Sequence, residues 1–466
     1  MGEIVKSISS NAEENQAKTN IERKRKVKPL PIKRFEIRDS LLTVLCQNPH
    51  IKVVKHIFVA CLIALFLNTV LQDFFEHGEI RVGYKLITNG LGKIQWVVFI
   101  WLMLNACATT SYLLYRFWAY LRIHHIPPKG LKIQLWDAVW LIGLITYYIF
   151  QFQVVSITVA YLKLPIGSSA IVCLEQTRLL MKIHAFMRSN IGRVLRYKPH
   201  SDEQLVLPNL HQFCYFLMAP TLIYCDEYPR RDAIRWKYVL ERVFELIGVL
   251  FYYAFLLERF MIPNLKDIGI RPFTLKELIM QAFNNFTLGL MFLLLAFYVV
   301  LDVTQNLIGE LLKFGDRKFY EAWWTSTSYS EYFRTWNMIV GDWLYTYVYK
   351  DMYEYVLPGS KIVAKLTVFI ISAIVHEWIL TCMFGFFFPA LFLAFGFTGG
   401  VLSFIPIPKV DMVNVFFWYF LALGSGLLTS MYAMEWFVRD NVPVDNSGSL
   451  IDYMVPRLFT CNCIIY

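Results

Sequence analysis

One histidine of this chain occupies a position where an ionisable side chain is unusual. His376 lies fifteen residues into the apolar run 361–388, which has no other charged residue between Lys365 and Glu377. An ionisable group inside a membrane span costs roughly 2.5 kcal/mol or more, so such a residue generally has a function. A neutral imidazole can act as a general base near pH 7. The alternative is a structural histidine that bonds a neighbouring helix.

Three further polar residues share a helical face with His376. At about 100° per residue, Lys361, Lys365, Ser372 and His376 fall within one wedge of about 60°. Such a stripe usually lines a cavity enclosed by protein. Glu377 points about 100° away, and we expect it to bond a neighbouring helix. No second histidine completes an HExxH pattern and the nine cysteines lack ligand spacing, so we expect no metal site.

A second region, residues 313–355, is dense in aromatic and charged side chains. Cations beside aromatic rings suit an anionic, nucleotide-like ligand, with phosphates on the cations and a base stacked on a ring. An aromatic belt at the membrane interface is the alternative reading. Among the charged and amide residues of the region are Arg317, Lys318, Arg334, Asn337, Asp342 and Lys350.

The composition indicates what kind of protein must position these residues. The chain has 466 residues, of which 57% are hydrophobic and 17% charged, whereas soluble domains have about 25% charged residues. We therefore expect an all-α, polytopic membrane protein. Residues 1–40 are polar and basic, and we expect a disordered cytosolic tail there, followed by one membrane domain over 41–466. The net charge of +10 fits the loops of a membrane protein, and we expect no nucleic-acid partner.

The apolar runs predict about nine membrane spans, each of about 20 residues. Nine spans place the N-terminus in the cytosol and the C-terminus in the lumen. Segments 208–224 and 336–356 are interrupted by polar residues, so we expect helices in the interface or packed inside the protein. The predicted spans are 53–75, 95–119, 136–161, 167–187, 238–262, 277–303, 361–382, 384–405 and 413–436.

At the second region the chain resembles a known family. Segment 319–325, FYEAWWT, resembles the FYxDWWN signature of the membrane-bound O-acyltransferase (MBOAT) superfamily, and the likeness is closest to its sterol O-acyltransferases. Asn337 precedes His376 by 39 residues, as expected for the family's Asn and His pair. The likeness covers about residues 40–466. Its further blocks are 326–330 (STSYS), 334–337 (RTWN), 342–345 (DWLY), 219–224 (APTLIY), 228–230 (YPR), 435–436 (EW) and 450–457 (LIDYMVPR).

The resemblance implies transfer of a fatty acyl group from acyl-CoA to a sterol 3-hydroxyl, within an intramembrane chamber enclosed by the helices. It implies His376 as general base and Asn337 as the group that orients the thioester carbonyl or donates to the oxyanion. Acyl-CoA is a co-substrate, and no cofactor is expected. The family also implies the endoplasmic reticulum membrane and a homodimer or homotetramer. The implied acyl-CoA contacts are Tyr332, Arg334, Tyr349, Lys361 and Ser372, with Trp336 shaping the site.

The chain departs from the family pattern at three positions. Ala322 replaces the Asp of the signature, Thr325 replaces its Asn, and Gly341 stands where the sterol branch usually has His. Two other functions therefore stay open: the same chemistry on diacylglycerol or a long-chain alcohol, and a catalytically silent protein that binds lipid or sterol. Near the C-terminus we expect Cys461 to form no disulfide, because a bridge to Cys463 would be strained.

Overall fold

The computed structural model is almost entirely helical. It describes residues 30–80, 83–127, 130–197, 205–270, 273–442, 449–461 and 464–465. The first half contains α2 (Leu41–Leu45), α3 (Pro49–His77), α4 (Tyr84–Gly90), α5 (Ile94–His124), α6 (Leu131–Leu162), α7 (Ile166–Arg196), α8 (Leu210–Met218), α9 (Trp236–Leu256), the π-helical turn η1 (Leu257–Met261) and α10 (Ile262–Leu265).

The second half contains the shorter elements around the motif and two long helices. They are β1 (Phe273–Thr274), α11 (Leu275–Asn284), α12 (Phe286–Phe297), η2 (Tyr298–Val303), α13 (Thr304–Leu311), η3 (Trp323–Thr325), α14 (Tyr329–Trp336), α15 (Met338–Leu344), η4 (Tyr345–Tyr349), η5 (Met352–Val356), α16 (Lys361–Phe384), η6 (Phe392–Gly399), α17 (Gly400–Leu402), α18 (Asp411–Asn441), α19 (Leu450–Met454), α20 (Arg457–Thr460) and β2 (Ile464–Ile465).

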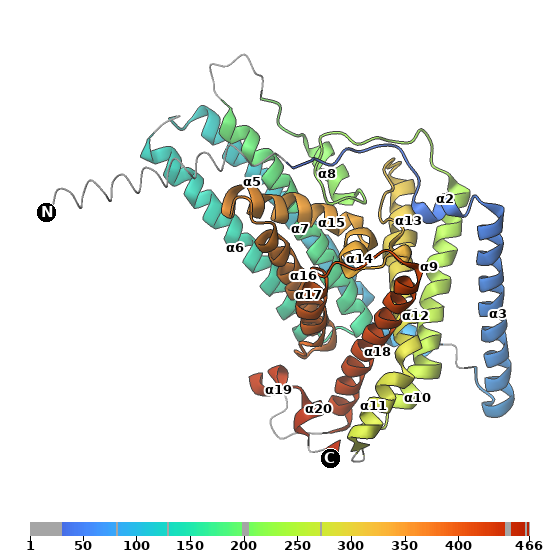
Figure 1. Ribbon diagram of the computed structural model, residues 1–466. Helices are drawn as coiled ribbons and strands as arrows, with labels where there is room; N and C mark the ends of the chain where they lie inside the picture. The colour runs from blue at the N-terminus through green and yellow to red at the C-terminus, as the bar shows by residue number, and fades with distance from the viewer. Residues whose placement is uncertain are drawn as a thin grey trace.

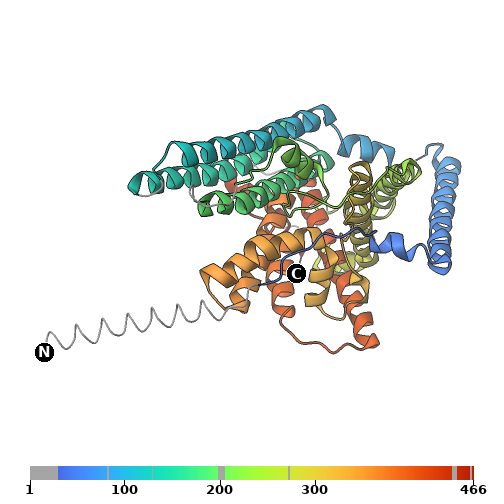
Figure 2. The ribbon, with the colours of Figure 1, turned by 90° about the horizontal axis from the view of Figure 1, so that it is seen from above.

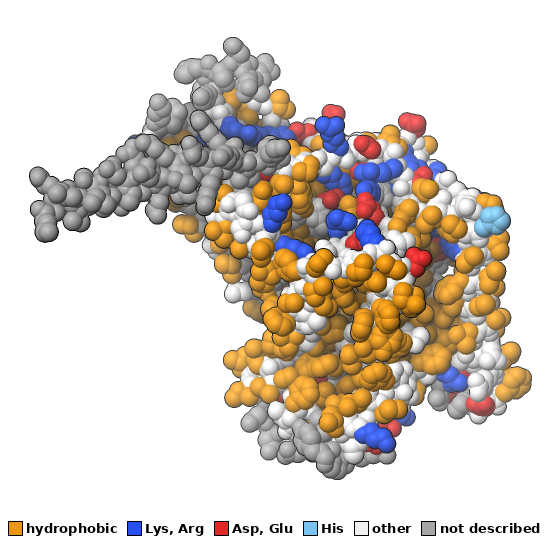
Figure 3. All heavy atoms as spheres, viewed as in Figure 1, with side chains coloured by type: hydrophobic (Ala, Val, Ile, Leu, Met, Phe, Trp, Pro, Cys, Tyr) orange, Lys and Arg blue, Asp and Glu red, His pale blue; other side chains and the backbone are white. Residues whose placement is uncertain are grey.

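Six helical stretches of the described chain are long and apolar enough to cross a membrane. They are 49–76 (α3), 94–124 (α5), 131–162 (α6), 286–311 (α12 through α13), 361–384 (α16) and 411–441 (α18). Hydrophobic side chains cover the middle of the visible face, and charged residues gather above it (Figure 3). The polytopic membrane architecture is confirmed, and six of the nine predicted spans coincide with these candidate helices. The predicted span 277–303 begins too early, because the chain breaks at Asn285 between α11 and α12.

The other three predicted spans are helical but are built differently, so the count of nine is not confirmed. Segment 238–262 lies in α9 and η1, and α9 contains the ion pair Arg242–Glu245 (2.8 Å). Segment 167–187 lies in α7, which buries Lys182 together with much of its apolar face. Segment 384–405 contains the end of α16 followed by η6 and α17, which together form a shorter apolar helix over 392–402.

The helix that carries His376 packs against several other elements. α16 packs against α7 on one side and against η4, η5 and η6 on others. Seen from above, α5, α6 and α7 lie side by side, and α3 stands apart at the opposite edge (Figure 2). The apolar window of α3 is only 6% buried. The ends of α16 follow from its sequence, because Gly359 precedes it and Gly385 stops it with a left-handed φ of 76°.

The crossing of α12 and α18 depends on two glycines. A Cβ atom added to Gly289 would lie 2.5 Å from the Cα atom of Gly426, and one added to Gly426 would overlap Phe286. Small residues allow two membrane helices to approach at backbone distance, where dispersion contacts hold them together. This crossing fixes the half of the bundle that packs behind the motif region.

The start of the described chain corrects the predicted tail of residues 1–40. Residues 30–40 are extended and docked against the motif region, and we call this segment the strap. It lies at the upper end of the molecule, opposite α20 (Figure 1). Residues 1–29 lie outside the described part, so disorder there stays a prediction. The strap forms ion pairs from Lys33 to Asp342 (2.6 Å) and from Arg38 to Asp316 (2.6 Å), and Ser40 bonds Asp302 (3.3 Å).

The C-terminal end folds back beside α18. β2 pairs with β1 in parallel, with Phe273 opposite Ile464 and Thr274 opposite Ile465. The expectation that Cys461 forms no disulfide is wrong, because Cys461 is disulfide-bonded. The seven other cysteines of the described residues are free.

Candidate active site

The imidazole of His376 is held by its own helix. Its Nδ1 lies 2.7 Å from the backbone carbonyl oxygen of Ser372, one turn earlier in α16. A carbonyl oxygen can only accept, so Nδ1 must carry the hydrogen. In the neutral ring Nε2 then has a free lone pair. The geometry therefore selects the tautomer in which Nε2 can accept a proton.

The His376 side chain is exposed, although it lies in the interior of a predicted span. Its ring centroid lies 5.6 Å from that of Phe395 in η6, which covers one side of the imidazole. Two apolar cavities, of about 380 and 670 Å³, also lie along α16, but His376 lines neither. They share Ile374 and Trp378, which point to the opposite face of the helix.

Asn337 lies at the sharp break between α14 and α15. Its side-chain Oδ1 accepts a hydrogen bond from the backbone N–H of Val340 (3.1 Å), so it caps α15. The neighbouring N–H of Met338 donates to the carbonyl oxygen of Phe319 in the signature segment (2.9 Å). Because Oδ1 faces the helix, the Nδ2 group faces away from it. No described residue bonds this Nδ2 group, so Asn337 keeps a donor for a ligand.

The hydrogen bonds of Asn337 and His376 within the described chain stay inside their own segments, and aromatic rings connect the two. Phe333, one turn before Asn337, has its ring 5.0 Å from that of Phe395. Phe395 in turn contacts His376. Phe333 also packs against Phe369 of α16 (5.3 Å). The structure thus brings α14, α16 and η6 together around His376 through one shared aromatic contact.

Tyr332 and Trp336 belong to the aromatic core behind Asn337. Tyr332 is 6% exposed, and its ring lies 5.2 Å from that of Trp336. Trp336 contacts Trp323 of the signature segment at 4.5 Å and Phe297 at 4.8 Å. These rings hold α14 in place. The structure therefore supports a role in shaping the site for both residues more than an open contact surface at Tyr332.

Tyr349 lies in a stack of three tyrosines on the π-helical turns. Its ring is nearly parallel to those of Tyr345 (5.6 Å, 14°) and Tyr353 (6.1 Å, 10°). The π-helical spacing of η4 and η5 aligns the three rings at every fourth residue. η4 and η5 pack against α16 and η5 leads into it, so this stack lies near Lys361.

The cations of the motif region fall into two groups. Arg334 and Lys361 are exposed, and no ion pair joins either of them to another described residue. Lys361 is also the first residue of α16, where backbone N–H groups and the helix dipole favour an anion. Three other cations have carboxylate partners: Lys318 with Glu321, Lys350 with Glu354 (3.9 Å) and Arg317 with Glu310 (2.7 Å).

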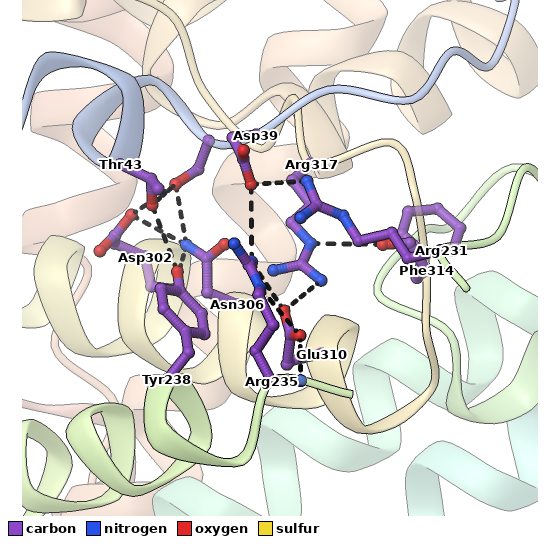
Figure 4. A network of polar contacts seen from close by, with 11 residues as sticks. Asp39, Thr43, Arg231, Arg235, Tyr238, Asp302, Asn306, Glu310, Phe314 and Arg317 are labelled. Atoms are coloured by element: carbon purple, nitrogen blue, oxygen red, sulfur yellow. Dashed lines mark hydrogen bonds and ion pairs between the residues drawn. The ribbon is translucent and has the colours of Figure 1, made fainter. Parts of the chain in front are cut away.

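Arg317, one of the cations noted in 313–355, lies in the interior of the protein. Both Arg317 and Glu310 have fully buried side chains. Figure 4 shows this pair at the centre of a network in which Arg235 also reaches Glu310 (2.8 Å) and Arg231 reaches Asp39 of the strap (2.6 Å). Burial lowers the pKa of Arg317, although Glu310 opposes this effect. The network has a structural role beneath the signature segment.

Thr325 and Gly341, two of the residues that depart from the family pattern, have the following local contacts. The Thr325 hydroxyl donates to the carbonyl oxygen of Ala322 (2.7 Å) and closes the short η3 turn. A Cβ atom added to Gly341 would meet no atom within 4 Å. Nothing in the packing of α15 therefore requires glycine at this position.

Two residues near His376 were not among the predicted site residues. Glu377 is 4% exposed and accepts from the Tyr432 hydroxyl of α18 (3.0 Å), which confirms that it bonds a neighbouring helix. Phe395 could not be identified as a site residue from the sequence, because it is one of several apolar and aromatic residues in the same run. Its position depends on how η6 packs against α16.

Comparisons with known proteins extend these observations. The family model described as MBOAT, membrane-bound O-acyltransferase family, matches residues 130–434. Sterol O-acyltransferase 1 of Mus musculus is 38% identical over 437 residues, which cover 92% of this chain and 79% of that protein. Sterol O-acyltransferase 1 of Chlorocebus aethiops is 37% identical, over 92% of this chain and 78% of that protein. Sterol O-acyltransferase 2 of Homo sapiens is 32% identical, over 92% and 80%.

Proposed function

The chain belongs to the membrane-bound O-acyltransferase family, and from this premise we propose that it transfers a long-chain fatty acyl group from acyl-CoA to the 3-hydroxyl of a sterol. The products are a sterol ester and free CoA. The observation that carries the proposal is the hydrogen bond from His376 Nδ1 to the Ser372 carbonyl oxygen (2.7 Å), because it leaves Nε2 as a base at membrane depth. The names of the relatives support the sterol as acceptor.

His376 acts as the general base of the transfer. Nε2 takes the proton of the sterol hydroxyl while the hydroxyl oxygen attacks the carbonyl carbon of the thioester. The tetrahedral intermediate then breaks its carbon–sulfur bond, and the departing thiolate receives the proton from Nε2. No acyl-enzyme is needed. Ser372 cannot be activated as a nucleophile by this ring, because the nitrogen nearest its hydroxyl (3.5 Å) is the protonated Nδ1.

Asn337 stabilises the charge that develops on the carbonyl oxygen. Its Nδ2 group is the free donor, since Oδ1 is held by the N–H of Val340. One preorganised donor of this kind contributes about 3 kcal/mol to the transition state. The cap fixes the direction of the amide before substrate binds, so reorganisation during the reaction is small.

The CoA moiety binds at the charged upper end of the molecule. Lys361 and the first N–H groups of α16 receive a phosphate. Arg334 provides a second exposed cation, and the half-buried tyrosine stack at Tyr349 offers an aromatic surface. Tyr332 and Trp336 form the wall behind them, and Ser372 lies between this end and His376 on α16.

The membrane setting supports the same assignment. Sterol and acyl chain both partition into lipid, so a base within a membrane helix meets them there, whereas CoA is polar and approaches from water. We place the enzyme in the endoplasmic reticulum membrane with a cytosolic N-terminus and a luminal C-terminus, as a homodimer or homotetramer. The opposite positions of the strap and α20 are consistent with that orientation (Figure 1).

An acyl-transfer assay with several acceptors tests the proposal. Membranes that contain this chain should convert labelled oleoyl-CoA and cholesterol to cholesteryl oleate. Triacylglycerol or wax ester as the product would leave the role of His376 intact and overturn the choice of acceptor.

A further inference from the structure

The short helix formed by η6 and α17 is attached to α16 at both ends. It runs antiparallel to α16, because its first residue meets Glu377 late in α16 and Ser403, which follows its last residue, meets Lys365 early in α16. α17 lies beside α16 in Figure 1. We call the two attachments the clamp.

At the first end, Glu377 binds the start of η6. The backbone N–H of Phe392 donates to Glu377 Oε2 (3.0 Å). The N–H of Leu391 donates to the hydroxyl oxygen of Tyr432 (3.2 Å), and that hydroxyl also contacts the Glu377 carboxylate. The first N–H groups of a helix have no partner within the helix. A carboxylate at this end therefore satisfies them and matches the helix dipole.

At the second end, Lys365 binds the close of α17. Its Nζ donates to the carbonyl oxygen of Ser403 (2.7 Å) and lies 4.3 Å from the ring centre of Phe404. The last carbonyls of a helix lack partners, and a cation there matches the negative end of the dipole. A carboxylate at the first end and an ammonium group at the second therefore fix the direction and the register of η6 and α17 relative to α16.

Between the two ends, close packing carries the register to His376. A Cβ atom on Gly396 would lie 2.8 Å from the Ala373 side chain, so the Gly396 backbone lies directly against that methyl group. Phe395, the residue beside this contact, is the one whose ring lies against the imidazole of His376. A shift of η6 by one residue would carry the Phe395 ring away from His376.

We propose that Glu377 and Lys365 are positioning residues of the reaction, which hold η6 and α17 in the register that keeps Phe395 against His376. The ring then stabilises the imidazole orientation in which Nδ1 bonds Ser372 and Nε2 is free. This inference rests on the proposed function, since positioning is read out through acyl transfer. It assigns Lys365 to the clamp, while Lys361 remains at the CoA end.

Steady-state kinetics of clamp variants test this inference. Glu377→Ala and Lys365→Met should each lower kcat about tenfold, with the KM for oleoyl-CoA within twofold, because misplacement of a catalytic group affects the chemical step. Glu377→Gln should retain activity within about threefold, since its amide oxygen still accepts from Phe392. Thr381→Val is the matched control, one turn further along α16 and outside the clamp.

A double-variant cycle separates positioning from general damage. Phe395→Leu combined with Glu377→Ala should be no worse than the poorer single variant, because both act through the same contact. Effects that multiply would overturn the proposal, as would a change in KM with kcat unchanged or activities equal to that of Thr381→Val. If Glu377→Ala fails to elute as a monodisperse peak in detergent, Lys365→Met decides, because that side chain is only half-buried.

The wild type and His376→Ala run in the same assay. A wild type without sterol-ester product would mean that the proposed function has failed. An active wild type with unaffected clamp variants would mean that only the clamp has failed.

Discussion

The backbone carbonyl oxygen of Ser372 lies 2.7 Å from Nδ1 of His376. This distance fixes the tautomer of the ring, because the carbonyl must accept and Nδ1 must donate. The base is therefore Nε2, and it is aligned by the α-helix itself. The carbonyl lies one turn earlier on the same helix, so an intact α16 places both groups.

Asn337 has two functions that one substitution can separate. In Asn337→Asp the carboxylate still accepts from the Val340 N–H and keeps the cap, but the Nδ2 donor is lost. We expect kcat to fall about 10²–10³-fold with little change in thermal stability. Asn337→Ala should lose both activity and about 1 kcal/mol of stability. Full activity in the Asp variant, with melting measured in parallel, would remove the donor role.

Lys361→Ala should weaken acyl-CoA binding more than it slows the chemistry. The side chain is exposed at the first turn of α16, where it adds charge to a site that favours anions. We expect the KM for oleoyl-CoA to rise about tenfold with kcat changed less, as for the loss of uniform binding. Lys132→Ala, another exposed cation, serves as the control. An unchanged KM would exclude Lys361 from the CoA site.

The buried pair Arg317–Glu310 should be sensitive to the loss of one partner. Glu310→Ala leaves the guanidinium of Arg317 buried without its carboxylate, which costs about 3–5 kcal/mol. Lys318 follows Arg317 in the chain and forms a half-exposed pair with Glu321. Lys318→Ala should lower the free energy of unfolding by at most about 1 kcal/mol. Melting of the detergent-solubilised variants measures both. Equal melting temperatures would show that the network of Figure 4 is not structural.

Gly341→Ala should stabilise the protein. The residue lies inside α15, and an added Cβ atom meets nothing within 4 Å. Replacing glycine by alanine in a helix then contributes about 0.5–1 kcal/mol, mainly by restricting the unfolded chain. A higher melting temperature is the expected result, and an unchanged or lower one would contradict this prediction.

Local sequence features and the family resemblance pointed to candidate site residues, whose roles stay predictions. His376 and Asn337 could be identified because their types and spacing are unusual in apolar or aromatic surroundings. The direction of Glu377 followed from helix geometry alone and is confirmed by its bond to Tyr432. These properties depend on residues a few positions apart.

The features that sequence reasoning missed depend on how the chain folds back on itself. Lys33 belongs to the predicted polar tail, yet it forms an ion pair with Asp342, 309 residues away. From the sequence, Arg317 is a candidate cation for a phosphate, but in the structure it is buried against Glu310 of α13. Segment 384–405 has the composition of a span, and the two attachments to α16 that make it a short covering helix leave no periodic signal.

Acyl transfer by His376 variants tests the central claim most directly. Membranes from acyltransferase-deficient cells that express the wild type, His376→Ala or His376→Asn would receive labelled oleoyl-CoA and cholesterol. His376→Asn keeps an amide donor for the Ser372 carbonyl but provides no base. We expect sterol ester from the wild type alone, with both variants inserted and eluting at the same size in detergent. More than a tenth of wild-type activity in either variant would contradict His376 as the general base.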